Sequence, residues 1–116
     1  IHISAINVLF PPAPYWAAYQ ASKTAADQWF RTVATELKPA HIRITSVYLP
    51  LVRTRMIEPT KAYRNMPAMS VGQAAIVIAR CIFKRKKVFK PWWCTASQWL
   101  SFIFEKQWLY ISGRLN

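Results

Sequence analysis

The fold is decided by residues 15–37, which read YWAAYQASKTAADQWFRTVATEL. No Pro or Gly interrupts this Ala-rich run and Lys38-Pro39 follows it, so we predict one long amphipathic helix. The predicted apolar face consists of Ala18, Ala21, Ala25, Trp29, Val33 and Leu37. The predicted polar positions are Lys23, Asp27, Arg31 and Glu36. The small alanines indicate close packing against a sheet or another helix.

Two predicted strands flank this helix. Residues 1–9 and 41–49 are apolar, β-branched runs, and prolines follow both of them. The later predicted elements are an irregular loop with a short helix over 51–69, a helix over 71–83, a short strand over 88–90 and a helix over 92–111, with Ser112-Gly113 as its stop. Ser70 is the predicted N-cap of the second helix. This order is typical of an α/β fold, with a parallel sheet and helices on its faces.

Composition narrows the classes of protein. The chain has 116 residues, an apolar fraction of 53% and a net charge of +12, which exclude a disordered polar tail and favour an anionic partner. Gly72 and Gly113 are its only glycines, so a glycine-rich phosphate loop cannot be complete here. The two Cys and two His have no metal-ligand spacing, which argues against a metal site. The chain begins without Met and without a signal-peptide pattern, so we expect a piece of a cytoplasmic protein.

One pair of side chains carries the chemistry. Tyr19 and Lys23 lie four residues apart in the predicted helix and therefore share one face. A phenol with its ordinary pKa of about 10 is a poor base at neutral pH, but a nearby ammonium group favours the phenolate. Such a pair can pass a proton to or from a substrate oxygen. The spacing alone also describes an accidental Tyr/Lys pair on a solvated helix face.

The surrounding motifs distinguish these two interpretations. Residues 19–23, YQASK, on an Ala-rich helix after a strand that carries Ser, resemble the short-chain dehydrogenase/reductase superfamily. Residues 50–54, PLVRT, are similar to its Pro-Gly-x-x-x-Thr segment, with Leu51 in place of the glycine. Residues 48–63, YLPLVRTRMIEPTKAY, resemble more narrowly the bacterial fatty acyl-CoA reductases of that superfamily. The resemblance extends over about residues 2–90.

The resemblance implies a role for individual residues. Tyr19 would be the catalytic acid/base, and Lys23 would lower its pKa and bind the nicotinamide ribose. The backbone at Pro50 and Val52, together with the Thr54 hydroxyl, would hold the carboxamide of NADP or NAD. The implied activity is hydride transfer between this cofactor and a carbonyl or alcohol, a fatty acyl-CoA or fatty aldehyde. The hydride chemistry belongs to the cofactor, while the protein supplies position and electrostatics.

The resemblance also implies a domain organisation. Residues 1–91 would be the C-terminal portion of a Rossmann-like, doubly wound parallel sheet, and residues 92–116 an aromatic C-terminal helix or tail. The family's glycine-rich turn and first four strands have no counterpart here, so activity would require a missing N-terminal half. We expect the isolated chain to expose strand edges and to self-associate, and a homo-oligomer is left open.

The family's catalytic serine is where the sequence departs from the pattern. Strict alignment of residues 3–6, ISAI, places Ala5 at the serine position and leaves Ser4 as the nearest candidate hydroxyl. Adjacent side chains of a strand point to opposite faces, so either Ser4 is re-aimed or this copy is impaired. Losing such a hydrogen-bond donor costs on the order of 100-fold in rate. The alternative function is a catalytically impaired fragment that binds a membrane or a partner.

A basic run and an aromatic segment end the chain. The basic residues are Arg80, Lys84, Arg85, Lys86, Lys87 and Lys90. They describe either a solvated strand edge or a site for anionic lipid or acyl-CoA phosphates, and the absence of a recognition motif argues against nucleic acid. The charge-free span over residues 91–104 is shorter than the ~20 residues that cross a bilayer. We therefore predict either peripheral membrane contact through residues 84–111 or packing on a partner.

Overall fold

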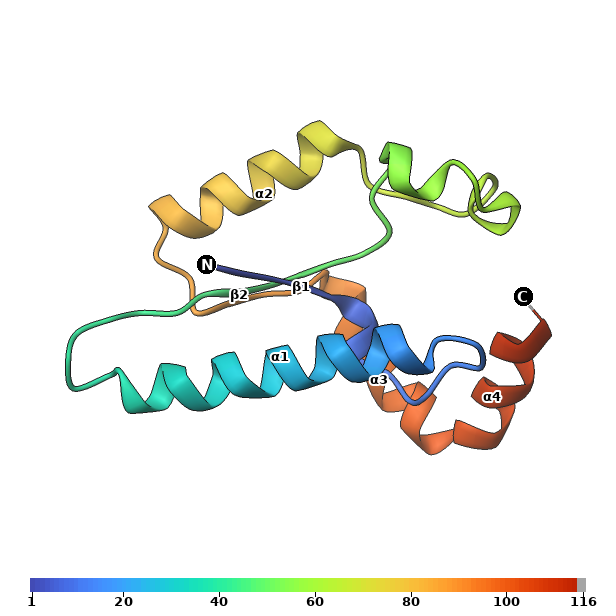
Figure 1. Ribbon diagram of the computed structural model, residues 1–116, viewed down its shortest axis with the longest axis horizontal. Coiled ribbons are helices and arrows are strands. Elements are labelled where there is room, and N and C mark those ends of the chain that lie inside the picture. Colours follow the sequence, from blue (N-terminus) through green and yellow to red (C-terminus); the bar gives the residue numbers. More distant parts are fainter. Residues whose placement is uncertain (115–116) are drawn as a thin grey trace.

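The computed structural model describes residues 1–114 and has an α/β architecture (Figure 1). Strands β1 (His2–Ala5), β2 (Ser46–Leu49) and β3 (Val88–Phe89) form a parallel sheet in the order β1-β2-β3. Helix α1 (Ala17–Glu36) connects β1 to β2, and helix α2 (Val71–Phe83) connects β2 to β3. The predicted parallel sheet with helices on its faces is confirmed.

The two connecting helices lie on opposite faces of the sheet (Figure 1). The strand order runs in one direction across the sheet, so helices on opposite faces require crossovers of opposite hand. Parallel crossovers are right-handed almost without exception, and one of these two departs from that rule. The fold therefore contains a feature that hydrophobic patterning could not predict.

Both long predicted strands are shorter than expected. β1 ends at Ala5, and Ile6–Leu9 form a 3-10 helix, η1, because the Gln20 side chain donates hydrogen bonds to the carbonyls of Asn7 and Phe10. These carbonyls thus find a side-chain donor in place of a neighbouring strand. In the second predicted strand, over 41–49, only the residues of β2 form a strand.

Helix α2 agrees with the prediction at both ends. The Gln73 amide donates to Ser70 Oγ at 3.1 Å, and the Ser70 amide donates to Gln73 Oε1 at 2.9 Å. This reciprocal pair satisfies two amides that the first turn leaves without partners. The loop before α2 contains two short 3-10 helices, η2 (Arg55–Ile57) and η3 (Lys61–Tyr63).

The aromatic C-terminal segment forms two helices where one was predicted. Helix α3 (Trp92–Ile103) ends at Phe104, whose φ of −108° and ψ of 42° lie outside the helical region, and α4 (Glu105–Arg114) follows. The predicted stop at Ser112-Gly113 is also wrong, because α4 continues to Arg114. Among residues 1–114, no helix has the length and hydropathy of a membrane span. Residues 115–116 of the predicted tail lie outside the described residues.

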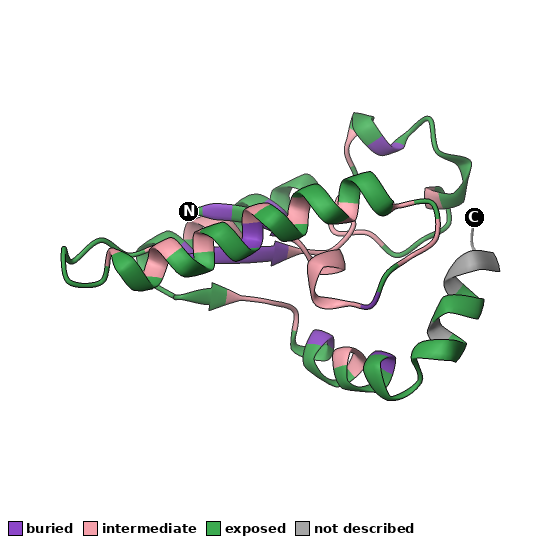
Figure 2. Cartoon of the chain, turned by 60° about the horizontal axis from the view of Figure 1, so that its bottom comes forward, coloured by how far each residue is buried: buried purple, intermediate pink, exposed green. Residues whose placement is uncertain are grey.

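Helix α1 is rotated relative to the prediction. Its predicted apolar face is half-buried at Val33 and Leu37, and the remaining residues of that face are exposed, namely Ala18, Ala21, Ala25 and Trp29. The helix instead buries Asp27 against the sheet, with Oδ1 3.6 Å from His2 Nε2 of β1. Figure 2 shows that most of the surface of α1 is exposed or half-buried. The possible homo-oligomer stays a prediction.

Candidate active site

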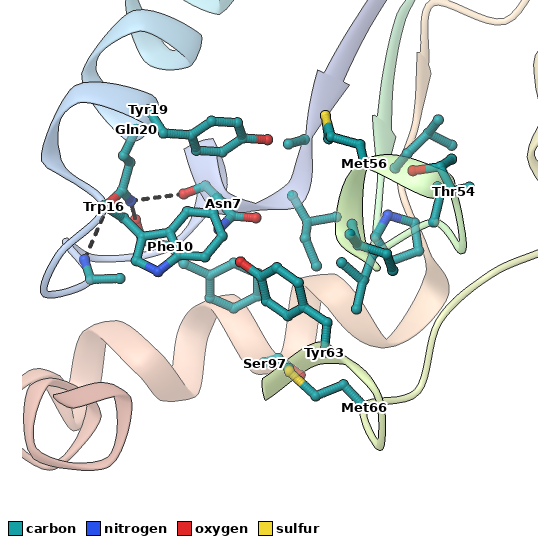
Figure 3. Close-up of a pocket in the computed structure, with 18 of the residues that line it drawn as sticks. Asn7, Phe10, Trp16, Tyr19, Gln20, Thr54, Met56, Tyr63, Met66 and Ser97 are labelled. Atoms are coloured by element: carbon teal, nitrogen blue, oxygen red, sulfur yellow. Dashed lines mark hydrogen bonds between the residues drawn. The ribbon is translucent and has the colours of Figure 1, made fainter. Parts of the chain in front are cut away.

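A cavity of about 630 Å³ opens at the carboxyl ends of β1 and β2 (Figure 3). In open α/β sheets this end of the strands is where ligands bind. The cavity is bounded by the first turn of α1, the loops after β1 and β2, and α3. Its lining is largely apolar and includes Phe10, Trp16, Leu49, Leu51, Met56, Ile57, Tyr63, Met66 and Trp93.

Tyr19 presents its phenol to this cavity from the first turn of α1 (Figure 3). Its ring packs edge-on against Trp16, with ring centroids 5.3 Å apart. Burial raises the pKa of Tyr19 above its ordinary value. A phenol of this kind is protonated at neutral pH and can donate a hydrogen bond or a proton to an oxygen placed in the cavity.

Lys23 follows one turn later and is half-buried, but it does not line the cavity. Its charge contributes to lowering the pKa of His2, which places the ammonium group toward the amino end of β1. The expected lowering of the Tyr19 pKa by Lys23 is not found, since the only cause acting on that phenol is burial, which raises it. In this chain Tyr19 is therefore arranged as an acid.

The segment after β2 forms another wall of the same cavity. Pro50, Val52 and Thr54 all line it, as does Tyr19. Two backbone hydrogen bonds anchor the segment, because the Arg53 amide donates to the Met69 carbonyl at 2.9 Å and the Met69 amide donates to Leu51 at 2.8 Å. The structure thus brings together four of the six predicted site residues, at spacings of up to 35 positions in the sequence.

These residues fit one end of a dinucleotide. Backbone groups at Pro50 and Val52, the Thr54 hydroxyl and the Tyr19 phenol surround an apolar cavity in which a flat ring with a carboxamide could lie. The pyrophosphate needs a glycine-rich turn at a helix N-terminus, and this chain has no such sequence. The chain therefore holds residues suited to the nicotinamide end alone.

Comparison with known families agrees with this geometry. The family described as short chain dehydrogenase matches residues 1–65, which include Tyr19, Lys23 and the segment after β2. The chain belongs to the short-chain dehydrogenase family. The three parallel strands and their helices are thus part of the Rossmann-like sheet that the sequence predicts. No solved structure matches the chain.

Three relatives show what share of a longer short-chain dehydrogenase this chain corresponds to. The chain is 47% identical to a fatty acyl-CoA reductase of Acinetobacter baylyi over 87 residues, which is 75% of the chain and 29% of the relative. It is 39% identical to a fatty acyl-CoA reductase of Mycobacterium tuberculosis over 75 residues, 65% of the chain and 26% of the relative. An uncharacterized oxidoreductase of Mycobacterium bovis is 37% identical over 87 residues, 75% of the chain and 25% of the relative. The chain therefore spans less than a third of each of them.

The serine of this short-chain dehydrogenase does not reach the cavity. Ala5 lines the cavity, whereas Ser4 is 3% exposed and its hydroxyl has no hydrogen-bond partner among the described residues. Ser4 lies on the same side of β1 as His2, which stacks on Phe30 of α1. The regular alternation of the strand therefore continues through Ser4, and the re-aimed hydroxyl considered from the sequence is not observed.

Sequence reasoning missed a residue inside the quoted YQASK motif. Gln20 donates to the Asn7 carbonyl at 2.9 Å, and its Oε1 accepts a hydrogen bond from the Ala13 amide at 3.1 Å (Figure 3). These bonds fasten the loop after β1 to the first turn of α1, beside Tyr19. The length of that loop and its prolines indicated that its backbone groups would need side-chain hydrogen-bond partners.

The loop between β2 and α2 contributes cavity-lining residues to which the sequence analysis assigned no role. Met56, Tyr63 and Met66 line it from the loop between β2 and α2. The Tyr63 ring lies 6.0 Å from that of Trp16, and Tyr19 contributes to raising the pKa of Tyr63, so the two phenols are neighbours. The concentration of Met and Tyr in an otherwise polar loop was the available signal.

Proposed function

We propose that the full-length protein transfers a hydride between NADP or NAD and an apolar carbonyl or alcohol, with a fatty aldehyde or fatty acyl-CoA as substrate. The observation that carries this proposal is the Tyr19 phenol opening into an apolar cavity whose other wall is the segment 50–54. The activity named for the Acinetobacter and Mycobacterium tuberculosis relatives, fatty acyl-CoA reductase, supports the substrate class.

Each residue then has a definite part in the reaction. The cofactor, when bound, supplies or accepts the hydride. Tyr19 donates its proton to the carbonyl oxygen as negative charge develops there, and the raised pKa keeps that proton available. Lys23 binds the nicotinamide ribose, while the backbone at Pro50 and Val52 and the Thr54 hydroxyl hold the carboxamide. Ser4, whose hydroxyl is buried away from the cavity, would contribute only after a rearrangement of β1.

The substrate class follows from the lining of the cavity. Met56 and Met66 are flexible apolar side chains that adapt to irregular partners. Trp16 and Trp93 add flat apolar surfaces on other sides. An acyl chain matches such a lining, because burying it removes its apolar surface from water at little polar cost.

The test is a hydride-transfer assay of the full-length protein with NADPH and NADH, using a long-chain fatty aldehyde and a fatty acyl-CoA. Tyr19→Phe should lower turnover about 100-fold or more while leaving cofactor affinity nearly intact, because only the transferable proton is lost. The matched control is Tyr15→Phe, since Tyr15 is 88% exposed and does not line the cavity. Lys23→Met should lower both turnover and cofactor affinity.

Two results would contradict the proposal. If Tyr19→Phe kept more than about a tenth of the turnover, that tyrosine would not be the proton donor. If the unmodified full-length protein reduced neither substrate with either cofactor, the alternative of a catalytically impaired module would be favoured.

We also propose that the protein is cytoplasmic and makes peripheral membrane contact through residues 84–111. The supporting observation is the exposure of apolar side chains on α3, with Trp92 at 91% and Trp99 and Ile103 at 68% each. The exposed basic residues 84–87 precede α3 in the chain. Trp-rich surface next to basic residues suits the interface of an anionic bilayer. Packing of α3 on another protein surface is the alternative, and vesicle binding separates the two.

A further inference from the structure

A single side chain holds the loop wall of the cavity. Arg53 donates from Nη1 to the carbonyls of Tyr63 and Arg64, both at 3.3 Å, and from Nη2 to the carbonyl of Met66 at 3.1 Å. The three carbonyls belong to the last residue of η3, Tyr63, and to two residues just after it, Arg64 and Met66. The guanidinium therefore links the start of the loop between β2 and α2 to residues ten or more positions later in the same loop.

Two of the three carbonyls that Arg53 binds belong to residues that line the cavity. Tyr63 and Met66 line it, and Tyr63 is the residue that approaches Trp16 and Tyr19. The base of the loop is closed independently by the backbone pairing of Val52 with Met69. Arg53 thus acts on the tip of the loop, where the wall of the cavity lies, and not on its base.

The chemistry of the side chain suits this task. The Tyr63 carbonyl accepts a local backbone hydrogen bond from the Met66 amide at 3.3 Å, and Arg53 adds side-chain donors to this carbonyl and to those of Arg64 and Met66. A guanidinium has five N–H donors in a rigid plane and can reach several carbonyls at once, and its charge strengthens each bond. A lysine has one compact ammonium group, which cannot span the carbonyls of Tyr63 and Met66 in the same way.

We propose that Arg53 is a positioning residue for recognition of the substrate's apolar chain. It holds residues 61–66 closed, so that Tyr63 and Met66 cover the chain of a substrate whose carbonyl lies at Tyr19. The proposal rests on the proposed function. Because Arg53 acts through the loop and not on the reacting atoms, its loss weakens binding of long-chain substrates and leaves the chemical step largely unchanged.

Kinetics of the full-length protein test the role in recognition. With a long-chain aldehyde, Arg53→Met should raise KM about tenfold and change kcat less than about twofold, whereas KM for a short-chain aldehyde should change little. Arg53→Lys should restore part of the long-chain KM. The matched control is Arg55→Met, because Arg55 is exposed in the same loop and does not line the cavity. Equal KM changes for both chain lengths, or none, would overturn the proposal.

Amide hydrogen exchange provides a readout that needs no substrate. In Arg53→Met the amides of residues 61–66 should exchange about tenfold faster than in the unmodified protein, while those of α1 stay unchanged. Arg55→Met should leave both regions unchanged. Unaltered exchange over residues 61–66 would overturn the positioning role even if the enzyme is active. Faster exchange in a protein that reduces no carbonyl would leave the contact of Arg53 established and defeat the proposed function instead.

Discussion

Helices α1 and α3 differ in what they bury and in how much apolar surface they expose. The buried residue of α1 is Asp27, a carboxylate, while its Ala-rich face and Trp29 are turned outward. In α3 the buried residues are Cys94 and Ser101, and the exposed ones include Trp99 and Ile103. The difference indicates that α1 places a charged group against the sheet, whereas most of the large apolar side chains of α3 are exposed in the described part of the chain.

A small layer of buried polar groups lies at the middle of α1, about two turns from Tyr19. Asp27 Oδ1 lies 3.6 Å from His2 Nε2, and burial together with the Asp27 carboxylate raises the pKa of Tyr48. The His2 ring stacks on Phe30 at 4.3 Å. Since Tyr19 and Asp27 are two turns apart, this layer sets the rotation of α1 that directs the Tyr19 phenol into the cavity.

The largest change in the free energy of unfolding is expected from Asp27→Ala. Removing the carboxylate takes away the charged group that faces His2 in this buried layer and leaves its space empty, so the free energy of unfolding should fall by about 3 kcal/mol. The measurement is urea unfolding of the full-length protein, with Glu36→Ala, an exposed acid of the same helix, as control. A loss similar to that of the control would mean that the apolar parts of α1 hold it in place.

A smaller effect comes from Tyr48 at alkaline pH. Burial and the Asp27 carboxylate raise the pKa of Tyr48 to about 12. The folded state therefore prefers the protonated phenol, so this contribution is complete below the unfolded pKa of about 10 and is lost as pH rises from there toward about 12. Between about pH 8 and about pH 11 the free energy of unfolding should fall by about 1 kcal/mol more in the unmodified protein than in Tyr48→Phe. Parallel pH profiles for the two proteins would show that Tyr48 does not contribute.

The same contrast separates what could be predicted from the sequence from what could not. Helix α2 is specified locally, because Ser70 and Gln73 cap it within one turn, and its bounds are confirmed. The family resemblance implies that Tyr19 and the segment 50–54 belong to one site, and in the structure they line one cavity. The inward position of Asp27 and the carbonyls bound by Arg53 depend on tertiary contacts that no local pattern encodes.

The smallest change in the free energy of unfolding is expected from replacements in α3. Replacing Trp99 and Ile103 with Ser should change the free energy of unfolding by less than about 0.5 kcal/mol, because both side chains are 68% exposed. A loss of several kcal/mol would show that this surface is buried in the full-length protein. That result would favour the packing alternative over membrane contact.

Vesicle binding then tests what covers α3. Each Lys or Arg near an anionic surface contributes about 1 kcal/mol, and salt screens this share. Burial of each large aromatic or aliphatic side chain adds roughly 2 kcal/mol that salt does not screen. Binding of the full-length protein to vesicles with anionic lipid should therefore weaken in high salt without vanishing, and Trp emission should shift to the blue.

The Trp99 and Ile103 double replacement should remove the salt-resistant part of the binding, whereas Gln at Lys84, Lys86 and Lys87 should remove the salt-sensitive part. If vesicles change neither the emission nor the sedimentation of the protein, α3 is a packing element.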